Sequence, residues 1–303
     1  MIYHIQIITL LVITLITSVA FAKKESLRIG SYNLKNYLIM NRLVEGVYKK
    51  DYPKPEIEKA ALRSIITSHD IDILTVQEIG GEKFLKELQN DLKKEGSDYP
   101  FSAIIKGLDP VRQVAILSKV PFKKIHQHNQ LSFKYYKQHN AVQRGLLQAD
   151  FSYNKHDFSI FVVHLKSHLS QNPKDPESKQ LRYMEVTKIQ QFIKNFSLKT
   201  PSSLYLLTGD FNDPIKSKTL NRLQKVNKLE ISKRLESYDS RNEVWTYYYK
   251  KIGQYSTFDH ILVSPNAYTR IVNKKAQIVD SENSLIASDH RLIYTDISLS
   301  NKD

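Results

Sequence analysis

The most constraining feature of this chain is a short apolar run that leads directly into a polar turn. Residues 203–207 (SLYLL) have the length and the flanks of a buried strand, and residues 208–213 (TGDFND) follow at once. A glycine at a strand end lets the backbone turn sharply, so we expect Asp210 and Asn212 to emerge together at the rim of a sheet. A carboxylate beside a carboxamide can deprotonate and orient a water molecule. The same residues are also common in ordinary turns, so this segment alone leaves both interpretations open.

The N-terminus has the pattern of a secretory signal peptide. Residues 5–21 are almost wholly apolar, and Ala20 and Ala22 have the small-residue spacing that a signal peptidase recognises. Residues 1–4 carry no Lys or Arg, and the apolar run is nearly long enough to remain as a membrane anchor. Because no second apolar span follows, we expect residues 1–22 to be removed. We therefore predict a secreted or periplasmic protein without a stable membrane anchor.

The length of the remaining chain, residues 23–303, is consistent with one large domain or two small ones, and a chain of this size can fold without covalent cross-links. The chain has no Cys, which excludes thiol catalysis and cysteine-based metal sites. Lys and Arg number 45 against 31 acidic residues, a formal charge of +14, and none of these residues lies within the first 22. This excess favours a polyanionic partner, either nucleic acid or an anionic membrane, although lysines also serve solubility alone.

The hydrophobic pattern alternates strands with a few helices. Apolar residues at helical spacing predict helices over residues 56–69, 82–94 and 176–196. Strands are predicted over residues 27–33, 71–77, 101–105, 114–117, 146–151, 158–165, 204–207, 244–249, 260–263 and 292–298. Two strand-rich halves with helices between them indicate an α/β protein in which two packed sheets are flanked by helices.

Polar side chains gather at the ends of these predicted strands. They are Asn33, Glu78, His164, Asp210, Asn212, Asp259, His260, Asp289 and His290. Each has an ordinary alternative: Glu78 as a carboxylate at a helix N-terminus, His164 and His260 as buried strand residues, and Asp289 as a cap. Their common position at strand ends, where loops place functional groups, favours a single site.

The residue types in this group match one kind of chemistry. Carboxylate and amide oxygens from Asn33, Glu78 and Asp289 suit a hard cation such as Mg²⁺ or Mn²⁺. The HExxH sequence of a zinc site is absent, and no two histidines are four residues apart within a predicted helix. A carboxylate such as Asp259 beside His290 would favour an imidazolium that stabilises negative charge on phosphorus. With Asp210 as the base, the set predicts a hydrolytic phosphodiesterase.

Six ordered segments also resemble the motifs of a known family. Residues 32–34, 77–79, 163–167, 209–213, 258–264 and 288–290 are similar to those of the endonuclease/exonuclease/phosphatase superfamily, in its deoxyribonuclease I-like, secreted bacterial nuclease branch. The resemblance runs from about Arg28 to Ser298 and makes residues 23–303 a single catalytic domain. It implies a four-layer αββα sandwich, in which two mixed β-sheets are flanked by helices.

The resemblance implies roles for individual residues. Glu78 is the principal metal ligand with Asn33 and Asp289 beside it, and the ion is Mg²⁺, with Mn²⁺ or Ca²⁺ as alternatives. Asp210 orients or deprotonates the attacking water. The other implied groups are Asn212, His164 and His290 at the phosphate, Asp259 holding His290, and Arg144 or its competitor Arg112 as phosphate-facing cations.

The substrate remains open among three hypotheses. The charge and the acid–histidine set favour a metal-dependent endonuclease on nucleic acid, preferably DNA, acting as a monomer without a protein partner. The alternatives are a sphingomyelinase or phospholipase C-type enzyme or an inositol-phosphate phosphatase, and thirdly a non-catalytic module that binds polyanions. A lipid enzyme should expose an apolar patch, and the sequence shows no clear one, since Tyr135 and Tyr136 lie between lysines. Residues 245–251 mix aromatic and basic side chains, which suits either base stacking or a half-buried strand.

Overall fold

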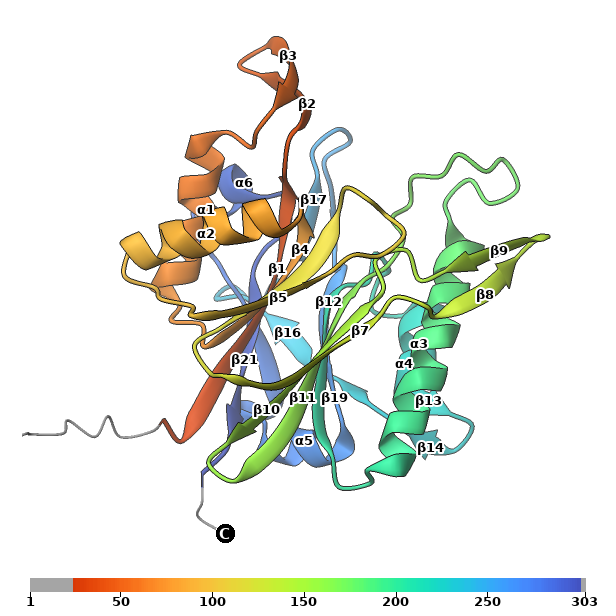
Figure 1. The fold of residues 1–303 in the computed structure, drawn as a ribbon. Coiled ribbons are helices and arrows are strands. Elements are labelled where there is room, and N and C mark those ends of the chain that lie inside the picture. Colours follow the sequence, from red (N-terminus) through yellow and green to blue (C-terminus); the bar gives the residue numbers. More distant parts are fainter. Residues whose placement is uncertain (1–23, 301–303) are drawn as a thin grey trace, which may run out of the picture.

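The computed structural model describes residues 24–300, so the predicted signal peptide lies outside the described residues. Within that range, the helices are all too short or too polar to cross a membrane. Two mixed β-sheets lie face to face, with helices on the outer side of each (Figure 1). The predicted αββα sandwich is therefore confirmed.

The first sheet has seven strands, and a parallel pair, β1 and β4, lies near its centre. Its order is β16 (Glu236–Tyr238), β20 (Lys275–Ile278), β21 (Ile293–Ser298), β1 (Ser26–Tyr37), β4 (Ile73–Ile79), β6 (Gln113–Ser118) and β5 (Phe101–Ile105).

The second sheet has six strands around a parallel pair formed by β11 and β12. Its order is β15 (Lys233–Arg234), β19 (Asp259–Val263), β12 (Leu204–Asp210), β11 (His156–His164), β10 (Leu146–Tyr153) and β7 (Phe122–His128).

Four two-stranded ribbons and six α-helices complete the described chain. The ribbons are β2 (Met40–Val44) with β3 (Val47–Tyr52), β8 (Ser132–Tyr135) with β9 (Gln138–Ala141), β13 (Lys225–Val226) with β14 (Leu229–Glu230), and β17 (Tyr247–Tyr249) with β18 (Gln254–Ser256). The helices are α1 (Glu56–Ser68), α2 (Glu82–Lys94), α3 (Lys179–Lys199), α4 (Lys218–Gln224), α5 (Pro265–Arg270) and α6 (Ser284–Ala287). A 3₁₀ turn spans Val272–Lys274.

Three hydrophobic cores separate the four layers. Successive side chains of a strand point to opposite faces, so one strand serves two cores. In β4, Ile73 belongs to the core between the sheets, whereas Leu74 packs in the core beneath α1 and α2. In the second sheet, Ile160 enters the central core and Phe161 joins the core that contains Val186 of α3.

Strand register brings the predicted polar groups to one edge of the sandwich. In the second sheet His164 of β11 lies opposite Asp210 of β12, and Asp210 lies opposite Asp259 of β19. In the first sheet Asn33 of β1 lies opposite Gln77, the residue before Glu78. A hydrogen bond of 2.9 Å between the hydroxyls of Thr75 and Thr208 ties β4 to β12 across the central core. The polar ends of the two sheets therefore meet.

Glycine is required at position 209 for a different structural reason from the one predicted. It lies within β12, opposite Val163, instead of turning the chain at the strand end. Its φ is +144°, and a Cβ there would lie 1.9 Å from the carbonyl oxygen of Val163. Glycine is therefore required by close approach of the backbones, and the left-handed turn comes later, at Asn212 with φ of +50°.

Most predicted elements are present with shifted ends. Helix α2 has the predicted bounds, whereas α3 begins and ends three residues later than predicted. Of residues 244–249, only Tyr247–Tyr249 form a strand. The β2–β3, β8–β9 and β13–β14 ribbons were not predicted, because exposed two-stranded segments lack the apolar alternation of a buried sheet.

Candidate active site

A cavity of about 840 Å³ opens where the polar ends of the two sheets meet. Eight of the ten predicted site residues line it: Glu78, Arg112, Arg144, His164, Asp210, Asn212, Asp289 and His290. The other two, Asn33 and Asp259, are fully buried and make hydrogen bonds to residues of the cavity. The fold thus gathers the entire predicted set in one place.

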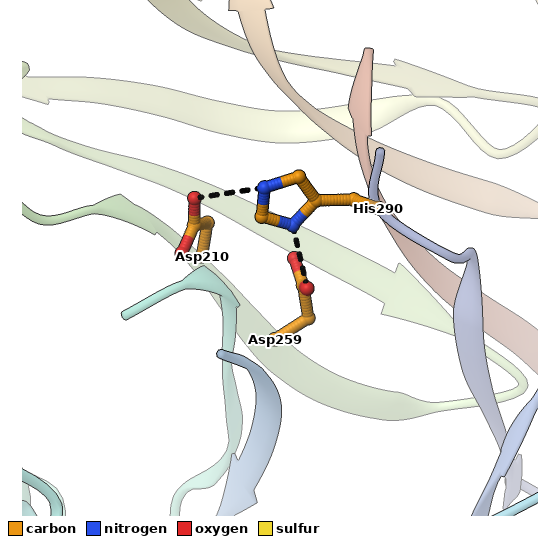
Figure 2. A group of neighbouring side chains, drawn as sticks. All are labelled: Asp210, Asp259 and His290. Carbon is orange, nitrogen blue, oxygen red and sulfur yellow. Dashed lines mark hydrogen bonds and ion pairs between the residues drawn. The ribbon is translucent and has the colours of Figure 1, made fainter. Parts of the chain in front are cut away.

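His290 lies between two carboxylates at the centre of the site (Figure 2). Its Nδ1 is 2.8 Å from Oδ2 of Asp259, and its Nε2 is 3.8 Å from Oδ2 of Asp210. Burial alone would lower the pKa of His290, but the charges of Asp259 and then Asp210 outweigh it and raise this pKa to about 10. The side chain is therefore an imidazolium at neutral pH.

Asp210 is held in one orientation by three donors. Its Oδ2 accepts from the amide groups of Asn33, at 3.0 Å, and Asn212, at 3.2 Å, while its Oδ1 accepts from the backbone N–H of Asn212 at 2.8 Å. Burial is the main influence on its carboxyl group and raises the pKa of Asp210 to about 7. A carboxylate of this kind is suited to accept a proton from water near neutral pH.

His164 differs from His290 in charge. Its Nε2 lies 3.6 Å from Oδ2 of Asp210 and 3.9 Å from Oε1 of Glu78. Burial, reinforced by the charges of Arg144 and His290, lowers the pKa of His164 well below its usual value. The cavity therefore contains two hydrogen-bond donors of different charge, the neutral imidazole of His164 and the imidazolium of His290.

Glu78 and Asp289 are the carboxylates that the sequence predicted as metal ligands. Glu78 has φ of +63°, an unfavourable backbone conformation for a residue with a long side chain. Its Oε2 accepts the backbone N–H of Asn36 at 2.8 Å, so the carboxylate is held in place near the end of β4. Both carboxylates line the cavity, and oxygen donors of this type fit Mg²⁺, Mn²⁺ or Ca²⁺.

Two other groups bear on the metal prediction. Asn33 donates through Nδ2 to Asp210 and accepts the N–H of Lys35 at Oδ1, so its amide already serves to orient Asp210. Donor atoms of Asp210, Asp259 and His290 lie within 4.8 Å of one another and form a second candidate metal site. Since His290 already contacts Asp259 through a hydrogen bond, Glu78 and Asp289 are the better match to a hard cation.

Arg112 and Arg144, predicted as competitors, are placed together by Asp109. Arg144 pairs through Nη2 with Oδ2 of Asp109 at 3.0 Å, and the backbone N–H of Arg112 donates to its Oδ1 at 3.0 Å. Nε and Nη1 of Arg144 are buried and have no hydrogen-bond partner among residues 24–300. Buried donors without a partner are costly, so these groups are poised for an anion.

The cavity also has an aromatic side that the sequence left undecided. Tyr247 stacks on Phe258 with ring centres 5.1 Å apart, and Phe258 stacks on His168 at 5.3 Å. These rings and Tyr249 line the cavity, so part of residues 245–251 faces the site instead of the core.

Sequence reasoning assigned no role to several residues that support the site. Glu185 of α3 accepts the backbone N–H of Gln143 and of Lys166, both at 2.8 Å, and so fixes the two loops that carry Arg144 and Lys166. Lys166 also lines the cavity. The position of Lys166, two residues after the end of the strand that carries His164, was the sequence signal that could have identified it.

Asp213 and His260 serve the structure around the site. Asp213, which had no assigned role, pairs with Nε of Arg182 at 3.1 Å. His260 donates from Nε2 to the carbonyl oxygen of Asp213 at 3.1 Å and packs edge-on against Phe211. His260 is thus the buried strand histidine of the alternative interpretation.

Comparison with known proteins identifies the family. Residues 30–290 match the model of the Endonuclease/Exonuclease/phosphatase family. A family member from Bacteroides vulgatus has a similar structure, with a TM-score of 0.64, 14% identity and coverage of 90% of this chain and 99% of the other. Beta toxin from Staphylococcus aureus has a TM-score of 0.61 at 17% identity, with coverage of 89% of this chain and 99% of the toxin chain. The mannosyl-6-phosphatase Bt3783 of Bacteroides thetaiotaomicron has a TM-score of 0.59 at 18% identity, with coverage of 89% of this chain and 98% of the other. No curated protein matches the sequence.

Fold and site together define a metal-dependent phosphoester hydrolase architecture. At identities below one fifth, the structural likenesses show the fold alone. The family match covers most of the chain, and this protein belongs to the endonuclease/exonuclease/phosphatase family.

Proposed function

We propose that this protein is a secreted, divalent-metal-dependent phosphodiesterase that hydrolyses nucleic acid, with DNA as the preferred substrate and cleavage within the strand. The observation that carries this proposal is the lining of the cavity. Arg112, Arg144 and Lys166 supply positive charge, while Tyr247 and Phe258 supply stacked rings beside the Asp210–His290 pair. Phosphates and planar bases are the two features that such a lining recognises.

The chemistry follows from the charge states of the side chains. Asp210 accepts a proton from water as the water oxygen bonds to phosphorus. The ester P–O bond breaks on the opposite side, and the departing oxygen leaves with a proton from solvent or from the site. Imidazolium His290 and the free N–H groups of Arg144 stabilise the negative charge that develops. When bound, a divalent ion at Glu78 and Asp289 supplies Lewis-acid polarisation of the phosphate.

A substrate panel with a matched variant tests this function. The mature protein is mixed with Mg²⁺ and plasmid DNA, single-stranded DNA, RNA, sphingomyelin vesicles, inositol phosphates or mannose 6-phosphate. We expect EDTA-sensitive cleavage of DNA, and Asp210→Asn should lower its rate by about 10²-fold or more. Lys228→Glu, a surface change at the β13–β14 turn, is the control. DNA binding without turnover would indicate the non-catalytic module instead.

A phospholipid phosphodiester is the second candidate, because the structure has the exposed apolar patch that the sequence did not reveal. The β2–β3 ribbon projects from the end of β1 (Figure 1), and Leu43, Val47 and Tyr48 on it are 74%, 58% and 67% exposed. Apolar side chains beside lysines suit the surface of a membrane. Release of phosphocholine from sphingomyelin vesicles, abolished by Leu43→Ser with Val47→Ser, would favour this candidate over DNA.

A further inference from the structure

Two smaller hollows continue from the catalytic cavity along the protein surface. The first, of about 430 Å³, shares Lys166 and Leu169 with that cavity and also contacts Tyr135. The second, of about 550 Å³, shares Tyr135 with the first. The connected hollows form what we call the lysine trench, whose members are Lys134, Tyr135, Tyr136, Lys166, Lys174 and Lys179.

The outer part of the lysine trench lies between the β8–β9 ribbon and the loop before α3. Figure 1 shows this ribbon beside the upper end of α3. The hydroxyl of Tyr135 donates to Oδ2 of Asp175 at 2.9 Å and accepts from the amide of Asn172 at 3.1 Å. The hydroxyl of Tyr136 donates to the carbonyl oxygen of Lys174 at 3.0 Å. The two tyrosines therefore fix the ribbon to the loop and keep its lysines beside those of the loop.

The positive charge of the lysine trench is largely uncompensated. Asp175 is buried, and its carboxylate accepts backbone N–H groups at the start of α3 in addition to the Tyr135 hydroxyl. Glu177 is paired with Lys179 at 2.7 Å. Lys134 and Lys174 are exposed and form no ion pair with any residue in the range 24–300. Two free ammonium groups thus lie beyond Lys166, on the way out of the catalytic cavity.

We propose that the lysine trench binds the phosphate backbone of a nucleic-acid strand beyond the phosphate that is cleaved. This inference rests on the proposed function and specifies its substrate as a polymer. Ammonium groups bind successive phosphates as point charges without reading sequence. A small phosphodiester or a phosphomonoester ends inside the catalytic cavity and has no group to reach Lys134 or Lys174. A strand of several nucleotides has one phosphate for each.

Charge reversal with a matched control tests the proposal. The trench variant is Lys134→Glu with Lys174→Glu. The control is Lys199→Glu with Lys228→Glu, two exposed lysines at the far end of α3 and on the β13–β14 turn that line none of the three hollows. Binding of a fluorescent single strand of about 12 nucleotides is measured in EDTA over a range of salt concentrations, so that the readout does not depend on turnover. Hydrolysis of bis(p-nitrophenyl) phosphate with Mg²⁺ is measured in parallel.

We expect the trench variant to bind the strand at least tenfold more weakly, with a salt slope lower by about 1.4, because each lost phosphate contact removes about 0.7 from the slope. Both variants should hydrolyse the small diester like the wild type. Equal loss of strand binding in the trench and control variants would overturn the proposal, as would loss of binding to phosphatidylserine vesicles with unchanged strand binding. Failure of the wild type to hydrolyse the small diester and DNA would refute the proposed function. The salt slopes of strand binding would still show whether the lysine trench binds nucleic acid.

Discussion

Replacement of Asp259 by Asn should move the pH dependence of catalysis, because Asp259 keeps His290 protonated. The two side chains are 2.8 Å apart and are 0% and 7% exposed. Opposite charges at that distance attract by about 6 kcal/mol when the effective dielectric constant is about 20. At about 1.4 kcal/mol per pH unit, loss of this charge should lower the pKa of His290 from about 10 to about 6. The variant would then carry a neutral imidazole at pH 8.

The assay is kcat for DNA or a small diester with saturating Mg²⁺ between about pH 5 and pH 9. Protonation of Asp210 below its pKa of about 7 slows both proteins, so each rate is compared with that of the wild type at the same pH. Relative to the wild type, activity is kept below the pKa of His290 and lost above it, because the reaction needs the imidazolium. We expect Asp259→Asn to lose about 10²-fold at pH 8 and less than about tenfold at pH 5.5, since protonation is then restored. Asp157→Asn, which removes an exposed partner of Lys123, should behave like the wild type. A variant profile with the same shape as the wild type would refute the role of Asp259.

Three further changes test the fold around the site. Gly209→Ala should lower the free energy of unfolding by about 3 kcal/mol, because its Cβ would lie 1.9 Å from the carbonyl oxygen of Val163; urea unfolding measures it. Arg291→Leu should cost about 3 kcal/mol by the same measurement, since it removes the buried cation 2.8 Å from the buried Asp239 and leaves only the exposed Arg241, 3.5 Å away. Burial lowers the pKa of His260 to about 3, so the unfolded chain binds a proton that the folded chain does not. Stability should therefore fall as the pH drops from about 6.5 towards 3, by up to about 1.4 kcal/mol per pH unit, and His260→Gln should reduce that slope.

Gly209→Ala has a control variant, and each of the other two predictions has a result that would contradict it. Gly46→Ala should cost only about 1 kcal/mol, because Gly46 has φ of +79° but nothing within 4 Å of the added Cβ. Equal losses at Gly46 and Gly209 would contradict the close-approach argument. A loss below about 1 kcal/mol for Arg291→Leu would mean that Arg241 or water compensates the charge of Asp239 after the change. An unchanged acid slope in His260→Gln would assign acid unfolding to other groups.

The pattern of the sequence predicted two packed sheets flanked by helices, and the family resemblance implied the four-layer arrangement. The period-2 and helical patterns predicted the main strands and helices. Polar residues at strand ends identified eight of the ten site residues as candidates, whereas Arg112 and Arg144 came from the family resemblance. Such local signals are strong because a strand buried on both faces is mostly apolar, so a group of charged and amide side chains near its end stands out. Helix α2 was predicted with its observed bounds because its apolar residues recur at regular helical spacing.

The tertiary structure decided which partner each side chain takes. Asn33 contacts Asp210 across the two sheets, 177 positions away, and Arg112 and Arg144 share Asp109 instead of competing. The lysine trench exists only because the β8–β9 ribbon packs on the loop before α3. Contacts between distant segments depend on strand register and on the stacking of two sheets, which no local pattern encodes. The sequence by itself thus determined the chemical groups of the site, and packing alone decided their orientation, their pKa values and the shape of the surface around them.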